Sequence, residues 1–108
     1  MASRKNIDTL MRELSLGLRR LYGGRLRGVY LFGSHARGDS DQESDVDVLI
    51  VLDAIGNYAH EVDSTGYLVS GISLEYGVSV SRIFVSHSDW LNGNTPFIMN
   101  VRGEAVAS

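Results

Sequence analysis

The chain has 108 residues, which is enough for one modest hydrophobic core but too few for two independently folding domains. We therefore expect a single domain over residues 1–108. Its 44% hydrophobic and 21% charged residues, with one proline, are typical of a folded globular protein and exclude a disordered chain. The net charge of −3 lacks the basic excess by which proteins grip a phosphate backbone, so we expect no stable nucleic-acid partner.

Cysteine is absent, which excludes both a disulfide framework and a thiolate metal site. The first residues, MASRKNIDTLMREL, are basic but lack the apolar region of a secretory signal, and no apolar run is long enough to cross a bilayer. These features favour a cytoplasmic location without membrane attachment.

Residues 7–22 are expected to form an amphipathic helix, because apolar side chains recur there at spacings of three and four. Arg19 and Arg20 suit the negative end of that helix, and the following Gly23 and Gly24 tolerate the positive φ that often ends one. The apolar positions are Ile7, Leu10, Met11, Leu14, Leu18 and Leu21.

Two runs of aromatic, aliphatic and β-branched residues, 27–32 and 46–52, are predicted to be strands. The second run is apolar at every position from 48 to 52. A strand of this kind is covered on both faces, so we expect it in the middle of a sheet flanked by helices.

The second half of the chain predicts a helix over residues 54–76, ended by Gly77, and a third strand over residues 78–85. Ser88 is expected to cap a short helical turn through Leu91. Residues 95–106 show no clear periodicity, so their structure stays open. The order of elements indicates an α/β or α+β fold in which helices pack against a small sheet.

Gly33 and Ser34 follow the first predicted strand and precede a helix start. Backbone N–H groups and a positive dipole meet at such a junction, which makes it suitable for phosphate. Gly33 permits close approach of a ligand, Ser34 adds a hydroxyl donor, and Arg37 adds a positive charge one turn later. The alternative is an ordinary turn.

Asp45 and Asp47 begin the second predicted strand and lie two residues apart. Their carboxylates then leave the same face, roughly 6–7 Å from each other, and both can reach one metal ion. Mg²⁺ prefers such oxygen ligands, completed by water and phosphate. Alternatively, Asp45 only caps the preceding turn and Asp47 lies at a solvated strand end. Asp53 is roughly 20 Å further along and is expected in a loop.

Together these two halves resemble the nucleotidyltransferase superfamily that includes polymerase beta, in which Gly-Ser is followed after about ten residues by Asp-x-Asp on a strand. Segments 72–86 and 95–106 resemble stand-alone bacterial and archaeal minimal nucleotidyltransferases, which are often encoded beside a HEPN-domain partner. The residues that match the small-protein form GSxARG…SDxD are Gly33, Ser34, Ala36, Arg37, Gly38, Ser44, Asp45 and Asp47.

The resemblance implies a nucleotidyltransferase fold with a small mixed sheet flanked by helices. It places Gly33 and Ser34 on the triphosphate of ATP or another nucleoside triphosphate, and Asp45 and Asp47 as the catalytic ligands of Mg²⁺. The implied reaction transfers a nucleoside monophosphate, preferably AMP, to a hydroxyl group. The implied acceptor is a HEPN-type protein for which this chain acts as the antitoxin; a homo-oligomer is also open.

The sequence departs from the family at the third carboxylate, which the family takes from a later strand. Residues 78–86 contain no acid, and Ser79 and Ser81 at the inward positions are poor ligands and poor bases. The loop offers three candidate substitutes, Asp39, Asp41 and Glu43. The departure keeps a second interpretation open: a non-catalytic nucleotide-binding antitoxin or regulatory subunit that acts by complex formation.

Several further side chains have two interpretations each. His35 either contacts phosphate or takes part in proton transfer, or it is a solvent-facing helix residue. Tyr30 and Phe32 either pack near a nucleotide base or, as is common for aromatic residues in a strand, lie in the core. Trp90 and Phe97 are also expected in the core, unless the tail forms a partner surface.

Overall fold

The computed structural model describes residues 4–40 and 45–108, which form a small sheet and the helices around it. In chain order the elements are α1 (Arg4–Tyr22), the 3₁₀ helix η1 (Gly23–Arg25), β1 (Leu26–Phe32), α2 (Ser34–Arg37), β2 (Val46–Leu52), α3 (Tyr58–Tyr76), β3 (Val80–Ser86), α4 (His87–Asn92), α5 (Pro96–Glu104) and β4 (Val106–Ala107).

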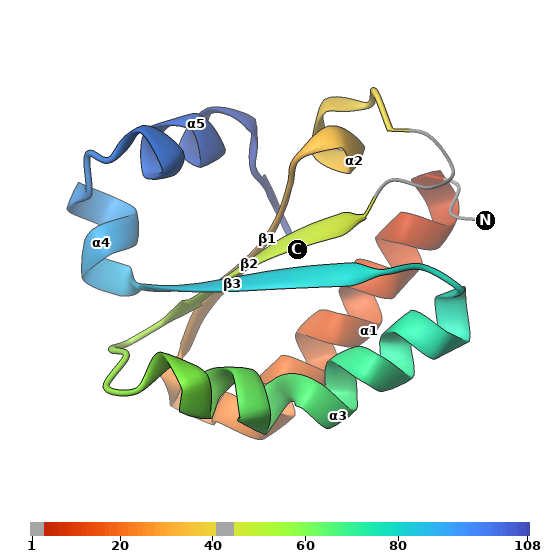
Figure 1. Cartoon of the computed structure of the whole chain (residues 1–108), viewed down its shortest axis with the longest axis horizontal. Coiled ribbons are helices and arrows are strands. Elements are labelled where there is room, and N and C mark those ends of the chain that lie inside the picture. Colours follow the sequence, from red (N-terminus) through yellow and green to blue (C-terminus); the bar gives the residue numbers. More distant parts are fainter. Residues whose placement is uncertain (1–3, 41–44) are drawn as a thin grey trace.

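The strands form one mixed sheet in the order β3-β2-β1-β4 (Figure 1). β2 pairs antiparallel with β1 and parallel with β3, while the short β4 pairs antiparallel with the other edge of β1. Every residue of β2 except Asp47 is buried. The predictions of a mixed sheet with helices and of a central, doubly covered strand are confirmed.

Side-chain alternation along β2 divides the core between the two faces of the sheet. Val48 and Ile50 belong to the cluster built with α1 and α3, whereas Leu49 and Val51 pack with α4 and α5 on the other face. Figure 1 shows α1 and α3 together beneath the sheet and α2, α4 and α5 above it. Asp47 has the parity of Leu49, so its side chain belongs to the face of α2, α4 and α5.

The two long helices follow the predicted pattern, but each begins at a different residue from the one predicted, α1 at Arg4 rather than at residue 7. α1 ends before Gly23, which adopts φ 56°, and α3 ends before Gly77 at φ 65°. α3 begins at Tyr58 rather than at residue 54, because the Asn57 side chain accepts a hydrogen bond from the His60 N–H at 3.1 Å and caps the helix there. Within the described ranges, no helix combines the length and the apolar character needed to cross a bilayer.

In the C-terminal part, the residue that caps α4 differs from the predicted one, and the segment of residues 95–106, for which no structure was predicted, contains helix α5. Ser86, not Ser88, caps α4, since its hydroxyl accepts from the Asp89 N–H at 3.1 Å. Thr95 caps α5 and Pro96 takes the first helical position, a combination that starts helices well. This segment covers the second face with aromatic contacts: Tyr30 with Trp90 at 4.8 Å and Phe32 with Phe97 at 5.9 Å between ring centroids. Tyr30, Phe32 and Trp90 pack against the core while partly buried, but Phe97 is 40% exposed, so the prediction of a core position is wrong for Phe97.

A buried carboxylate joins α3 to the end of α1. Glu61 is 3% exposed; it accepts hydrogen bonds from the Tyr22 hydroxyl at 2.8 Å and from Arg25 Nη2 at 3.0 Å. Arg25 also bonds Asp53 at 3.1 Å, which places Asp53 just after β2, as expected. Burial alone raises the pKa of Glu61, but the hydrogen bonds from Arg25 and Tyr22 outweigh burial and hold that pKa below its usual range.

The substitution Glu61→Ala is expected to lower the free energy of unfolding at pH 7 by about 2–3 kcal/mol, because it leaves the Tyr22 hydroxyl and Arg25 without their acceptor. Asp63→Ala, at an exposed position of the same helix, is the control and should change it by less than about 0.5 kcal/mol. Urea unfolding measures both.

The stabilisation by Glu61 should also depend on pH. Since its pKa is lowered on folding, its contribution is present above the unfolded pKa of about 4.3 and is lost as pH falls through the folded pKa. The difference between Glu61→Ala and the unmodified chain should therefore narrow on acidification. An equal difference at pH 7 and pH 3 would contradict this account.

Candidate functional site

The residues of the predicted site meet where β1 ends and β2 begins. Because these strands are antiparallel and Phe32 lies opposite Asp47, the residues that follow β1 stand beside the start of β2. α2 begins at once after Gly33 and contacts both strands. The antiparallel pairing thus brings Gly33, Ser34 and Asp47 together at one end of the sheet.

Gly33 is required at this junction for two reasons. Its backbone has φ 77° and ψ −157°, a conformation that is essentially restricted to glycine. A Cβ atom added here would lie 2.3 Å from Asp47 Oδ2. The chain therefore passes closer to the Asp47 carboxylate than any other residue would allow.

Ser34 is the first residue of α2, a single helical turn built on Gly33. The Gly33 carbonyl accepts hydrogen bonds from the N–H groups of Ala36 and Arg37, both at 3.1 Å, and Gly38 ends the turn at φ 83°. Ser34 is half-buried beside the strand ends. Ser34 thus directly follows the glycine that approaches Asp47, at the start of a helical turn, as a phosphate-contacting serine would need to do.

Asp45 is exposed directly before β2, and Asp47 is half-buried at its second position. Burial raises the pKa of Asp47 above its usual range, and the negative charge of Asp45 raises it further; the charges of His35 and Arg37 oppose the shift. A carboxylate that is partly desolvated beside a second carboxylate is a fitting partner for a divalent cation. Two such hard oxygen donors match the preference of Mg²⁺.

The register of β3 shows which residue stands where the family resemblance implies a third carboxylate. Ser81 lies directly opposite Asp47, and alternation puts its side chain on the same face. Asp39 is exposed and pairs with Arg37 at 3.2 Å, while Asp41 and Glu43 fall outside the described residues. Within residues 4–40 and 45–108, no three histidine or acidic side chains are grouped so as to hold a metal ion.

Glu104, which the sequence did not single out, lies at this junction. Its Oε2 accepts a short hydrogen bond from the Gly33 N–H, and Arg37 Nη1 lies 3.2–3.3 Å from both carboxylate oxygens. Arg37, predicted to face phosphate, therefore contacts two acids in this structure, Asp39 and Glu104. The Thr95-Pro96 cap signals the helix that carries Glu104, but only the tertiary fold places it against Gly33.

The burial of His35 decides against one of the two interpretations of this residue. The solvent-facing alternative is wrong, because His35 is 4% exposed. The reason is that α2 lies across the ends of β1 and β2, so that part of this single turn faces inward. Ala36 on the same turn also packs against the core. His35 is thus a buried neighbour of the site whose charge lowers the pKa of Asp47.

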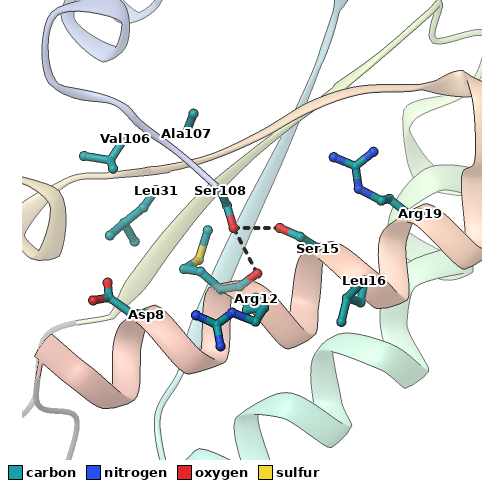
Figure 2. A pocket seen from close by; sticks show the side chains of 10 residues that line it. Asp8, Arg12, Ser15, Leu16, Arg19, Leu31, Val106, Ala107 and Ser108 are labelled. Carbon is teal, nitrogen blue, oxygen red and sulfur yellow. Dashed lines mark hydrogen bonds between the residues drawn. The ribbon is translucent and has the colours of Figure 1, made fainter.

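A hollow of about 430 Å³ lies elsewhere, between α1 and the C-terminal residues (Figure 2). Ser108 spans it, accepting a hydrogen bond from the Ser15 hydroxyl at 2.7 Å and donating one to the Met11 carbonyl at 3.1 Å. Neither Ser34 nor Asp47 lines this hollow. The hollow and the motif residues therefore lie at different places in the molecule. The candidate site is the junction of β1 and β2, because the residues suited to phosphate and those suited to a metal ion meet there.

Comparison with known proteins agrees with the motif. A family model described as a nucleotidyltransferase domain matches residues 11–85, which include the Gly33–Asp47 junction. A relative from Methanocaldococcus jannaschii, named as a candidate protein adenylyltransferase, is 37% identical over 81 residues, covering 75% of each chain.

Solved structures share the fold. A candidate minimal nucleotidyltransferase superimposes with a TM-score of 0.64 at 24% identity, covering 97% of this chain and 95% of its own. A crystal structure described as a toxin-antitoxin with AMP-PNP gives a TM-score of 0.61 at 17% identity, covering 87% and 68%. The glycine turn, the paired aspartates, the mixed sheet and the family match together show that this chain belongs to the nucleotidyltransferase domain family.

Proposed function

We propose that this chain is a Mg²⁺-dependent nucleotidyltransferase that transfers AMP from ATP to a hydroxyl group of a partner protein. The observation that carries the proposal is the contact between Gly33 and Asp47. It brings the Gly-Ser turn against the second aspartate of the Asp-x-Asp pair at one strand junction. Triphosphate and metal would then be bound next to each other.

Each residue of the junction has a task in this proposal. Gly33 permits the phosphates to approach the backbone, Ser34 donates a hydrogen bond to them, and Arg37 adds positive charge. Asp45 and Asp47 hold Mg²⁺, which would neutralise the charge that develops on the phosphate oxygens. The acceptor hydroxyl attacks the α-phosphorus of ATP, and pyrophosphate leaves.

The choice of a protein acceptor rests on the named relatives. The M. jannaschii relative is named for protein adenylyltransfer, and solved structures with this fold include toxin-antitoxin complexes, one of them with AMP-PNP. These names support a toxin as the partner and this chain as its antitoxin in the cytoplasm; the proposal that the toxin is of HEPN type rests on the sequence resemblance alone. Self-association into a homo-oligomer is compatible with this role.

One observation favours a second candidate, a non-catalytic antitoxin that acts by binding. Ser81 stands opposite Asp47 where the family resemblance implies a third carboxylate, and a serine hydroxyl is a poor base for activating the acceptor. In this version the junction still binds nucleotide, but the partner is silenced by contact.

Incubation of the chain with its partner, Mg²⁺ and ATP distinguishes the two candidates. A gain of one AMP in the intact mass of the partner, absent with the Asp45→Asn/Asp47→Asn variant, supports the transferase. A stable complex that silences the partner without a change in mass supports the binding role and contradicts catalysis. If the partner is neither modified nor bound, the antitoxin role is wrong in both versions.

Ser34→Ala tests the phosphate contact within the proposal. The variant should weaken binding of Mg-ATP about tenfold, because it removes one hydrogen bond to a charged group, and should leave binding of adenosine unchanged. Calorimetric titration with both ligands measures this. Ser70→Ala, at an exposed position of α3 on the far side of the sheet, is the matched control. Equal weakening for ATP and adenosine would contradict the phosphate contact.

A further inference from the structure

The contact of Glu104 with the Gly-Ser turn has a consequence for nucleotide binding. Glu104 is the last residue of α5, and its side chain is 23% exposed. One carboxylate oxygen accepts from the Gly33 N–H, and both oxygens lie within 3.3 Å of Arg37 Nη1. The Gly33 N–H and Arg37 belong to the same turn and helix to which the proposed function assigns the nucleotide phosphates.

Two negative neighbours lie near the Glu104 carboxylate, the end of its own helix and the Asp47 carboxyl group. Glu104 lies at the C-terminal end of α5, where the helix dipole is negative. Its charge also acts on Asp47, raising the pKa of that neighbouring carboxyl. The bonds to Gly33 and Arg37 compensate for both. An anion with two acceptor oxygens that is held by a backbone N–H and a guanidinium has the contacts of a bound phosphate group.

We propose that Glu104 is a built-in competitor for the nucleotide: its carboxylate and a phosphate group of the ligand compete for the Gly33 N–H and for Arg37. This inference rests on the proposed function, since it assumes that phosphate binds at the same junction. A ligand must displace Glu104, so its observed affinity falls below that of the junction alone. A strongly charged polyphosphate overcomes this competition better than a monophosphate does.

A Glu104 carboxylate that competes with phosphate and one that helps to bind the metal ion lead to opposite expected effects of removing its charge. If Glu104 instead contributed to metal binding beside Asp47, removing its charge would weaken Mg²⁺-dependent binding. If it competes, removing its charge strengthens binding. The sign of one affinity change therefore decides between the two roles.

The test is calorimetric titration of inorganic triphosphate with Mg²⁺ into the unmodified chain, Glu104→Gln and Glu104→Ala. Both variants should bind about tenfold more tightly, because each loses a charge-assisted contact that the ligand otherwise has to break. Asp63→Asn removes one negative charge from the exposed surface of α3 and should change the affinity by less than about twofold.

A second readout is the Gly33 amide proton in the NMR spectrum of the free chain. It should move upfield in Glu104→Ala, which removes its acceptor. Equal or weaker binding by the Glu104 variants, with binding by the unmodified chain intact, overturns the competition but leaves the proposed function standing. If the unmodified chain and the variants all fail to bind triphosphate, both the proposed function and this inference are wrong.

Discussion

Replacing Asp45 and Asp47 together by asparagine is expected to reduce Mg²⁺-dependent AMP transfer by about a thousandfold or more, because the two hard ligands of the cation are lost. Mg-ATP binding should fall to the level seen without Mg²⁺. Radiolabel transfer and calorimetry measure the two quantities. Asp53→Asn, at the exposed far end of β2, is the matched control and should leave transfer unchanged.

The same variant should not lose stability at neutral pH, which separates a functional role from a structural one. Burial and the charge of Asp45 raise the pKa of Asp47, so the folded chain prefers the neutral form of this carboxyl. The stability it contributes is present at low pH and is lost as pH rises through the raised pKa. Asp47→Asn mimics the neutral form and should be at least as stable at pH 7. Marked destabilisation, or transfer that survives the double substitution, would contradict the assignment.

Gly33→Ala is expected to have the second largest effect. A methyl group would lie 2.3 Å from Asp47 Oδ2, and the φ of 77° with ψ of −157° would strain any other residue. We expect the free energy of unfolding to fall by about 1–3 kcal/mol. Transfer should fall about 100-fold, because Asp47 is pushed from its position and small misplacements of reacting groups are costly.

The control for this substitution is Gly71→Ala on α3. A Cβ atom there meets nothing within 4 Å, and glycine inside a helix is unfavourable, so alanine should stabilise the chain by about 0.5–1 kcal/mol. Thermal unfolding and transfer assays on both variants measure the contrast. A Gly33→Ala variant that binds Mg-ATP and transfers AMP normally would show that the close approach to Asp47 has no functional part.

Sequence patterns predicted those parts of the fold that depend on local physics. The apolar spacing of α1 and the uninterrupted apolar run of β2 each reflect which sides of the element are covered, and both were observed. The start of α3 was misplaced because the side-chain cap by Asn57 outweighed the apolar pattern before it. The cap at Ser86 was missed because Ser88, two residues later, is an equally suitable type of residue.

The candidate site was only partly predictable for a similar reason. Gly33, Ser34, Asp45 and Asp47 occur close together in the sequence, at the ends of two successive strands, and the antiparallel pairing of these strands brings them to one junction. Glu104 is 71 residues from its partner Gly33, and no local pattern encodes that contact. The burial of His35 likewise depends on how α2 lies across the strand ends.

The most direct test of the central claim is to titrate the ¹⁵N-labelled chain with Mg-ATP and follow its backbone amide signals. The largest shifts are expected at Gly33, Ser34 and Asp47, and these shifts should be lost in the Asp45→Asn/Asp47→Asn variant. Shifts centred instead on Ser15 and Ser108, at the hollow in Figure 2, would show that the nucleotide binds away from the motif and would contradict the account.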